Sequence, residues 1–283
     1  MNLYKSHTLD RFKITNRVIV ITGGAGLLGK EHAEAVIEGG GIAILFDIKS
    51  EFLDHAMALL KEKYGNHVTV DGYVVDITNE DSIRKAVSQL KEKYGHIDGL
   101  INNAANNPKV EKNSNQITSV QFENFPIDVW MEDIAVGLTG SFLCSKVIGS
   151  IMAEQGCGVI LNISSDLGII APDQRIYQTE GLSENQQMVK PVTYSVIKHG
   201  LLGLTKYLAT YYAKKGVRCN ALCPAGVYNG QNEEFVLKLT NLIPMGRMAE
   251  INEYKSTILY LISDASSYMT GSTVINDGGR TCW

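Results

Sequence analysis

The stretch from Val18 to Gly29 reads VIVITGGAGLLG. Its first four residues, Val18 to Ile21, are all β-branched, which predicts a short strand that is buried on both faces. The glycines that follow allow a tight turn and the close approach of another group to the backbone. Apolar residues then recur at helical spacing over 28–37, so a helix is expected directly after the turn. This order presents unpaired N–H groups and the positive end of a helix dipole, which suit a pyrophosphate; a tight turn without a ligand is the alternative.

The alternation of strand and helix continues outward from this stretch. Strand-like runs and helical patterns follow one another at 42–46, 52–64, 68–75, 83–94, 99–101, 130–155, 159–163, 194–214, 216–222 and 273–275. Strands that alternate with helices predict parallel strands with helices on both faces. The predicted fold class is therefore α/β, a single Rossmann domain over 1–283 with a doubly wound parallel sheet of about seven strands.

Composition excludes several classes of protein. Apolar residues make up 45% of the chain and charged residues 20%, which is typical of a soluble globular protein. The net charge of −4, without a clustered basic segment, argues against a nucleic-acid partner. No run approaches the roughly 18 uninterrupted apolar residues of a membrane helix, and 1–16 lacks the apolar core of a signal peptide. We therefore expect a cytoplasmic protein that binds no membrane.

The cysteines and histidines show no pattern of a bridged or metal-bound protein. The five cysteines have no framework spacing, and Cys219 and Cys223 would lie about 13 Å apart along a strand, too far for a disulfide. Buried thiols in a reducing compartment are expected. The six histidines are scattered without metal-ligand spacing, so no metal site is expected.

Three long polar stretches interrupt the alternation, at about 106–125, 170–191 and 227–250. They start near the carboxyl ends of predicted strands, where open α/β sheets bind ligands. Their many Asn and Gln side chains can both donate and accept hydrogen bonds, as recognition of hydroxyl groups requires. We therefore expect three substrate loops and a polyhydroxylated small-molecule substrate, although solvated loops have the same composition. The cations of these loops that could bind a phosphate or carboxylate, unless they are only solvated, are Arg175, Lys190 and Arg247.

Asp47 ends the second predicted strand, 18 residues after Gly29. A carboxylate at this position can accept hydrogen bonds from both ribose hydroxyls of a dinucleotide, and it would repel a 2′-phosphate. The sequence therefore favours NAD over NADP as the cofactor.

A tyrosine and a lysine lie four residues apart in YSVIK, residues 194–198, on one face of a predicted helix. An ammonium group close to a phenol favours the phenolate and is expected to lower the pKa of Tyr194, which would make it an acid–base group near neutral pH. Ser165 ends a predicted strand and brings a hydroxyl to the same edge of the sheet. The pair alone is common on exposed helices, but together with the glycine turn and Ser165 it indicates a catalytic site.

In the order and spacing of these motifs, the chain resembles the short-chain dehydrogenase/reductase family, single-domain type, over about 12–279. The landmarks are TGGAGLLG (22–29), Asp47, Asp76, NNAA (102–105), NISS (162–165), YSVIK (194–198), Pro224-Ala225-Gly226 and NDGG (276–279). The resemblance implies that Tyr194 exchanges a proton with the reacting oxygen, that Ser165 orients the substrate carbonyl and that Lys198 binds the nicotinamide ribose. The cofactor-binding residues that it implies are Gly23, Gly26, Leu27, Leu28, Asp47, Ile48, Asp76, Ile77, Asn103, Ala104, Ala105, Tyr194, Lys198, Pro224, Ala225 and Val227.

Four features depart from the pattern of that family. Leu27 stands where the single-domain type usually has glycine, as in the branch of sugar-nucleotide epimerases. Gly137 stands where an asparagine usually supports a proton relay, and Ala225 replaces a glycine. Ser165 and Tyr194 are 29 positions apart, much farther than usual, so the intervening insertion is expected to hang over the pocket.

The resemblance implies an NAD(H)-dependent oxidoreductase that transfers hydride to or from a secondary alcohol or ketone. The insertion at 170–191 and the segment 194–235 are similar to oxidoreductases of bacterial surface-sugar assembly, such as flagellin modification, which implies a sugar or sugar derivative as substrate. An epimerase or dehydratase with retained NAD and a non-catalytic NAD-binding protein are the alternatives. In the family, helices that correspond to 130–155 and 194–214 form a dimer interface, so a homodimer or homotetramer is expected.

Overall fold

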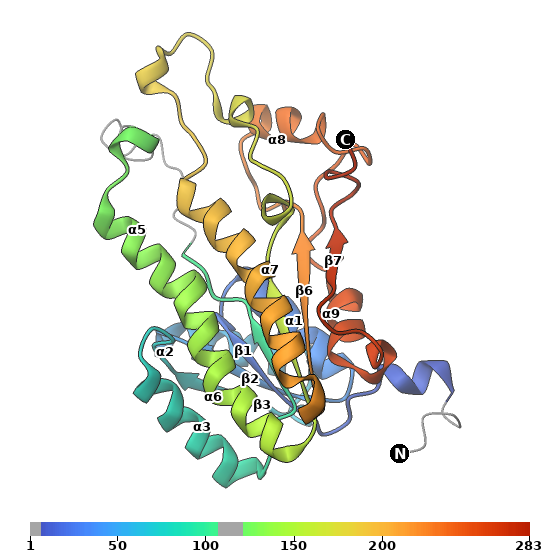
Figure 1. Ribbon diagram of the computed structural model, residues 1–283. Helices are drawn as coiled ribbons and strands as arrows, with labels where there is room; N and C mark the ends of the chain where they lie inside the picture. Colours follow the sequence, from blue (N-terminus) through green and yellow to red (C-terminus); the bar gives the residue numbers. More distant parts are fainter. Residues whose placement is uncertain (1–6, 107–120) are drawn as a thin grey trace.

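Seven parallel strands form one sheet in the computed structural model, which describes residues 7–106 and 121–283 (Figure 1). The strands are β1 (Val18–Thr22), β2 (Ile42–Asp47), β3 (Val70–Val74), β4 (Gly99–Asn102), β5 (Gly158–Ile163), β6 (Val217–Pro224) and β7 (Thr273–Asn276). Their order across the sheet is β3-β2-β1-β4-β5-β6-β7, and each neighbouring pair is parallel. The predicted fold class is confirmed. The order reverses between β1 and β4, and this is the crevice where such sheets bind ligands.

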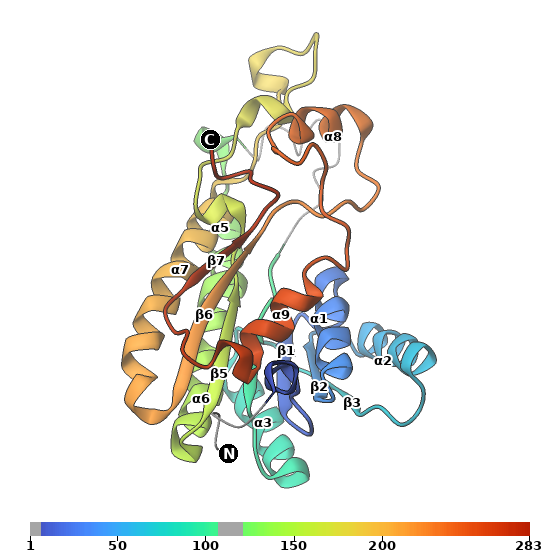
Figure 2. The ribbon, with the colours of Figure 1, turned by 90° about the vertical axis from the view of Figure 1, so that its right-hand side faces the viewer.

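Helices cover both faces of the sheet, which explains why its strands are apolar throughout. The described α-helices are α1 (Leu27–Glu38), α2 (Ser50–Tyr64), α3 (Glu80–Tyr94), α5 (Ile127–Ile134), α6 (Gly140–Gln155), α7 (Val192–Tyr212), α8 (Glu233–Thr240) and α9 (Lys255–Ile262). In β1, Val18 and Val20 pack into the core beneath α3, α6 and α7, whereas Ile19 and Ile21 pack toward α1, α2 and α9 (Figure 2). All five residues of β1 are buried, because successive side chains enter two different cores.

Two helical regions differ from the sequence prediction. The expected helix over 130–155 is interrupted by a π-helical turn at Ala135–Thr139, which separates α5 from α6. Helix α9 was not predicted, because its eight residues are too few to display a helical period distinctly. Helix α8 lies inside the third polar stretch.

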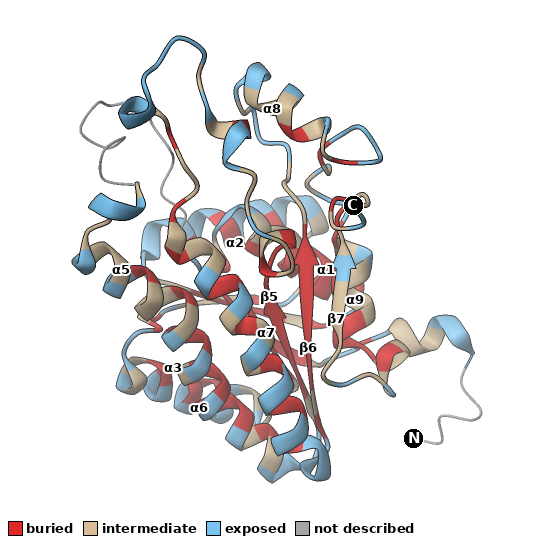
Figure 3. Ribbon diagram, turned by 45° about the horizontal axis from the view of Figure 1, so that its top comes forward, coloured by how far each residue is buried: buried red, intermediate tan, exposed pale blue. Residues whose placement is uncertain are grey.

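The second and third polar stretches extend beyond the carboxyl ends of the strands (Figure 1). The insertion at 170–191 contains two short 3-10 turns, Gln174–Tyr177 and Glu184–Gln186, and its outer part is exposed (Figure 3). A parallel bridge between Val227 and Ala249 joins the two ends of the third stretch to each other. Most of the first stretch, residues 107–120, lies outside the described residues.

The cysteines differ in how far they are buried. All five cysteines are free, and Cys144, Cys219 and Cys223 are buried as expected, but Cys157 and Cys282 are exposed.

The segment Ile127–Gln155 is long and apolar enough to cross a membrane by length and composition. Within the fold, its α6 part packs against α3, β4 and β5, and this packing explains its apolar character.

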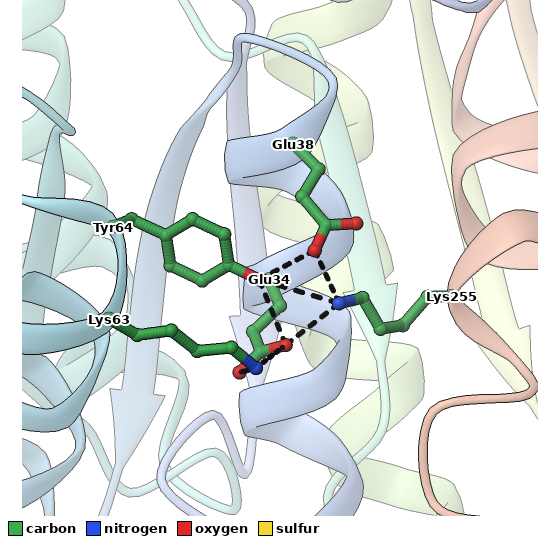
Figure 4. Close-up of polar contacts among 5 residues, drawn as sticks. All are labelled: Glu34, Glu38, Lys63, Tyr64 and Lys255. Carbon is green, nitrogen blue, oxygen red and sulfur yellow. Dashed lines mark hydrogen bonds and ion pairs between the residues drawn. The ribbon is translucent and has the colours of Figure 1, made fainter.

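A cluster of charged side chains ties α1 to α2 and α9 (Figure 4). The Glu34 carboxylate of α1 accepts hydrogen bonds from Lys63 (2.7 Å), Lys255 (2.8 Å) and Tyr64 (3.0 Å). Its side chain is only 9% exposed, and that of Lys255 is 16% exposed. Burial acts to raise the pKa of Glu34, but the hydrogen bonds from Lys255, Lys63 and Tyr64 outweigh it, so the pKa is lowered. Glu38 also bonds to Lys255 and Tyr64.

Replacing Lys255 with methionine is expected to lower the free energy of unfolding by about 1–3 kcal/mol. Loss of one partner from a fully buried ion pair costs roughly 3–5 kcal/mol, and Lys63 would still compensate part of the Glu34 charge. Chemical denaturation at pH 7 measures the difference. Lys63→Met is the matched control, because its side chain is 56% exposed and exposed pairs contribute about 1 kcal/mol or less.

The effect of Lys255→Met should depend on pH. The pKa of Glu34 is lowered in the folded protein, so its contribution to stability is present above its unfolded value near 4.5 and is lost as the pH falls through the folded value. The difference between the variant and the unmodified protein should therefore shrink in acid. An equal difference at pH 7 and pH 3 would contradict this account of the cluster.

Candidate active site

The glycine turn between β1 and α1 is built by close backbone contacts. Gly23 has a φ of +61°, which glycine adopts without strain, and its carbonyl accepts the N–H of Gly26 at 3.1 Å. A Cβ on Gly29 would lie 2.2 Å from the carbonyl oxygen of Gly23, so only glycine fits there. No side chain caps the N-terminus of α1 at Gly26, which leaves its first N–H groups facing the cavity that the turn lines.

Asp47 at the end of β2 lies beside this turn. Its carboxylate accepts hydrogen bonds from the backbone N–H groups of Ala25 (3.1 Å) and Ile48 (2.9 Å). These bonds hold the carboxylate at the mouth of the crevice and leave other lone pairs for a ligand hydroxyl.

Thr22 and Asn103 join the ends of β1 and β4 across the crevice. The Thr22 hydroxyl accepts the N–H groups of Asn103 (3.0 Å) and Ala104 (3.1 Å). The Asn103 side-chain amide donates to the carbonyl oxygens of Thr22 (3.0 Å) and Gly23 (3.2 Å). The segment Asn103 to Ala105 is thereby fixed against the glycine turn.

One cavity of about 920 Å³ runs from Asp47 to the insertion. Its walls contain every residue that the sequence singled out for the cofactor, and also Ser165. These residues are Gly23, Gly26, Leu27, Leu28, Asp47, Ile48, Asp76, Ile77, Asn103, Ala104, Ala105, Tyr194, Lys198, Pro224, Ala225 and Val227. The structure thus gathers them around one space, and the open helix N-terminus and the Asp47 carboxylate suit the pyrophosphate and a ribose of a dinucleotide.

The two serines at the end of β5 differ in their partners. Ser164 donates its hydroxyl proton to the carbonyl oxygen of Lys198 at 2.7 Å, so its side chain serves to dock α7. Ser165 donates to the carboxylate of Asp166 at 2.6 Å and accepts the N–H of Leu167 at 3.2 Å. A hydrogen bond between its hydroxyl and the phenol of Tyr194 acts to lower the pKa of the phenol, against the effect of burial. Ser165 is therefore the serine that shares an environment with Tyr194.

Lys198 is buried one turn after Tyr194 on α7. Its ammonium donates to the carbonyl oxygen of Ile163 at 2.9 Å and lies 5.6 Å from the centre of the Tyr194 ring. Burial, together with repulsion from Lys190, lowers the pKa of Lys198 to about 8.

The expected lowering of the Tyr194 pKa is wrong for this structure. Burial raises the pKa of the phenol, the nearby Asp166 carboxylate raises it further, and Ser165 opposes the rise. Lys198 does not reverse the shift, because its ammonium is directed at the carbonyl of Ile163. Four-residue spacing on a helix predicted which face the two groups share but not the hydrogen bond that one of them makes.

Gly137, where the related family has an asparagine, lies in the π-helical turn between α5 and α6. A Cβ there would lie 2.8 Å from Cγ2 of Ile197 on α7, so the side chain of Ile197 occupies the space that a larger residue would need. The carbonyl oxygen of Gly137 accepts the hydroxyl of Ser141 at 3.0 Å. The departure in sequence is thus matched by packing around it.

Three further residues complete the wall near Tyr194. Asp166, Tyr177 and Arg280 line the same cavity, from the end of β5, the insertion and the segment after β7. None was predicted as a site residue. The available signals were weak: Asp166 directly follows Ser165, and Arg280 directly follows the glycine pair 278–279 at the carboxyl end of β7.

Comparison with known proteins gives this arrangement a family. The family model described as enoyl-(acyl carrier protein) reductase matches residues 24–281. An NAD-dependent glycerol dehydrogenase from Listeria innocua is 32% identical over 278 residues, which cover 95% of this chain and 96% of that protein. The chain belongs to the short-chain dehydrogenase/reductase family. It is therefore an oxidoreductase, as the names of its dehydrogenase and reductase relatives indicate.

Other members of the short-chain dehydrogenase/reductase family differ in cofactor and substrate. A gluconate 5-dehydrogenase from Burkholderia cenocepacia, solved with NADP and tartrate, is 25% identical with a TM-score of 0.83; the match covers 98% of this chain and 100% of that chain. The post-translational flagellin modification protein A of Campylobacter coli is 29% identical, over 94% of this chain and 98% of that protein. The family as a whole binds NAD or NADP, and its members here act on sugar-like and steroid alcohols.

Proposed function

We propose that this protein is an NAD(H)-dependent dehydrogenase that oxidises a secondary alcohol, or reduces the corresponding ketone, of a sugar or sugar derivative. The observation that carries the proposal is the meeting of Ser165, Tyr194 and Lys198 in the cavity whose far end holds the glycine turn and Asp47. The carboxylate of Asp47 favours NAD, since it would repel the 2′-phosphate of NADP.

The protein residues supply orientation and the proton in this reaction. Bound NAD would accept or deliver the hydride. In the reductive direction Tyr194 donates its phenolic proton to the substrate oxygen while Ser165 orients that oxygen. In oxidation Tyr194 must first lose its proton to solvent, and the resulting phenolate accepts the proton of the alcohol. Burial raises the pKa of Tyr194, which keeps the phenol protonated and ready to donate at neutral pH.

A role in bacterial surface-glycan biosynthesis is the narrower part of the proposal. The flagellin modification protein among the relatives supports it, as do two amide side chains of the third polar stretch that line the cavity. These are Asn229 and Gln231, and their amides can bind sugar hydroxyls. Cytoplasmic location remains a prediction from the sequence, and assembly as a homodimer or homotetramer remains a prediction from the family resemblance.

Formation of NADH tests the proposal directly. The purified protein would be mixed with NAD and a panel of amino, phosphorylated and nucleotide-linked sugars, and absorbance at the NADH band would be followed. Turnover on a panel member supports the dehydrogenase. NAD binding without turnover on any member would contradict it and would favour an enzyme that retains its cofactor or a non-catalytic NAD-binding protein.

Replacing Asp47 with serine is expected to weaken NAD binding by about 10–100-fold, because hydrogen bonds to a charged group contribute about 1.5–3 kcal/mol. NADP should bind more tightly to the variant than to the unmodified protein, since the repelling carboxylate is gone. Titration with both cofactors measures the change. Asp54→Ser on the exposed side of α2 is the matched control and should alter neither affinity. An unchanged ratio of NAD to NADP affinity in Asp47→Ser would contradict the assignment.

A further inference from the structure

Two cations project into the substrate end of the cavity. Lys190, at the end of the insertion, holds its ammonium 3.8 Å from the centre of the Tyr194 ring. Arg280, four residues after β7, is only 7% exposed. Both line the cavity together with Ser165 and Tyr194. Lys190 precedes β6 in the sequence and Arg280 follows it, so only the fold brings the two cations to one cavity.

Neither cation has a close anionic partner among residues 7–106 and 121–283. No side-chain hydrogen bond or ion pair of Lys190 or Arg280 occurs within this part of the chain, and the buried Nε of Arg280 has no acceptor. The other two candidate cations are different. Arg175 pairs with Asp173 at 2.6 Å, and Arg247 pairs with Glu253 at 2.6 Å, both at the surface. The alternative that a loop cation only lies at the solvated surface therefore applies to Arg175 and Arg247 but not to Lys190.

The positive charges around Lys190 and Arg280 are only partly compensated. Asp166 interacts with both cations, but it already accepts hydrogen bonds from Ser165 and Leu167. Asp173 lines the same cavity and interacts with Arg280, but it is paired with Arg175 at 2.6 Å. Lys198 adds a third positive charge, 5.6 Å from the centre of the Tyr194 ring. Burial lowers the pKa of Lys190 to about 8, although Asp166 acts to raise it. An uncompensated buried charge is unfavourable, and a bound anion would relieve it.

We propose that Lys190 and Arg280 form an anion-binding subsite for the substrate, so that the substrate carries a carboxylate or phosphate close to the carbon that reacts at Tyr194. The planar guanidinium of Arg280 can bind two oxygens of such a group, and Lys190 adds a point charge. Since Lys190 contacts the ring of Tyr194, the anionic group lies a few bonds from the reacting alcohol. The inference rests on the proposed function and narrows its substrate class to small polyhydroxylated acids or sugar phosphates.

Matched substrates separate the two sources of negative charge. Gluconate, glucitol and glucitol 6-phosphate share a six-carbon chain, and glycerate, glycerol and glycerol 3-phosphate share a three-carbon chain. The subsite predicts a higher kcat/KM for the carboxylate or the phosphate of a set than for its neutral member. A preference for the acid identifies a carboxylate as the natural anion, and a preference for the phosphate ester identifies a phosphate. Equal or better use of the neutral members in both sets would overturn the proposal.

Substitutions assign the preference to the two cations. Lys190→Gln and Arg280→Gln should each raise KM for the favoured anionic substrate by about 10–100-fold, with little effect on the neutral member. Arg280→Lys retains the charge and should recover part of the loss. This variant also provides the test if Arg280→Gln does not fold. Arg247→Gln, at an exposed cation of the third polar stretch whose partner Glu253 does not line the cavity, is the control and should leave both substrates unaffected. Equal losses on charged and neutral substrates, or weakened NAD binding, would instead place the two residues in positioning Tyr194 or holding the cofactor, and would overturn the subsite.

A binding measurement keeps this inference distinguishable from failure of the proposed function. If the protein turns over no substrate, thermal unfolding with NAD would be recorded with and without gluconate and glucitol 6-phosphate. Stabilisation by either anion in the unmodified protein, absent from the Lys190→Gln, Arg280→Gln double variant, would support the subsite even though the dehydrogenase had failed. No stabilisation by either anion in such a silent protein would overturn the subsite as well.

Discussion

Tyr194→Phe is expected to reduce kcat for alcohol oxidation by a factor of about 10²–10⁴, the usual contribution of a general acid–base group. The substitution removes only the phenolic oxygen, so the ring can keep its contacts with Lys190 and Lys198. NAD affinity should therefore stay nearly unchanged. Initial rates of NADH formation and a titration of NAD binding, both on the purified variant, provide the two readouts.

The control for this substitution lies on the same helix. Tyr207→Phe removes a phenolic oxygen from α7 at a residue that is 62% exposed and lies about three and a half turns after Tyr194, and it should keep full activity. Wild-type rates in Tyr194→Phe would show that another group handles the proton. Loss of NAD binding along with turnover would mean that Tyr194 acts mainly in holding the cofactor.

Gly29→Ala is expected to weaken NAD binding about 100-fold and to lower the free energy of unfolding by about 1–3 kcal/mol. The added Cβ would lie 2.2 Å from the carbonyl oxygen of Gly23 and 2.8 Å from Cα of Gly24, and neither backbone atom can move without reshaping the turn. The reshaped turn would no longer present the N–H groups of α1 to a pyrophosphate. NAD titration and denaturant unfolding measure the two effects.

Gly203→Ala is the matched control for this prediction. Gly203 lies within α7, and a Cβ there would contact nothing within 4 Å. Alanine in the middle of a helix is more favourable than glycine by roughly 0.5–1 kcal/mol, so this variant should be as stable as the unmodified protein or slightly more so. If Gly29→Ala bound NAD as tightly as Gly203→Ala, the turn would not be the pyrophosphate site.

Local sequence patterns predicted the elements of this fold correctly where each element carries its own period. The run at β1 is apolar at every position because both faces of the sheet are covered, and this pattern is visible without the structure. The glycine turn is equally local, since the contact between Gly29 and Gly23 spans only six residues. The π-helical turn around Gly137 has no such local period. It depends on how α5 and α6 pack against Ile197 of α7, and the sequence predicted one continuous helix there.

The candidate catalytic residues could be named from the sequence, but the shifts in their pKa values could not be predicted from it. The spacing of Tyr194 and Lys198 placed both on one helix face, yet the pKa of Tyr194 is raised, because burial and Asp166 act on the phenol and the Lys198 ammonium bonds to Ile163. Desolvation depends on every element that covers a group. A linear pattern describes only the neighbours along the chain.

The sequence by itself determined the parallel α/β architecture and the glycine turn after β1, and it named the candidate acid–base residues, because helical and strand periods and glycine requirements are local properties. Only the tertiary structure decided which loop cations enter the substrate end of the cavity. Arg175 and Lys190 belong to the same insertion, but the first pairs with Asp173 at the surface and the second lies over Tyr194 beside the distant Arg280. Long-range packing determines which of these cations lies in the cavity, and the spacing of residues along the chain does not predict that packing.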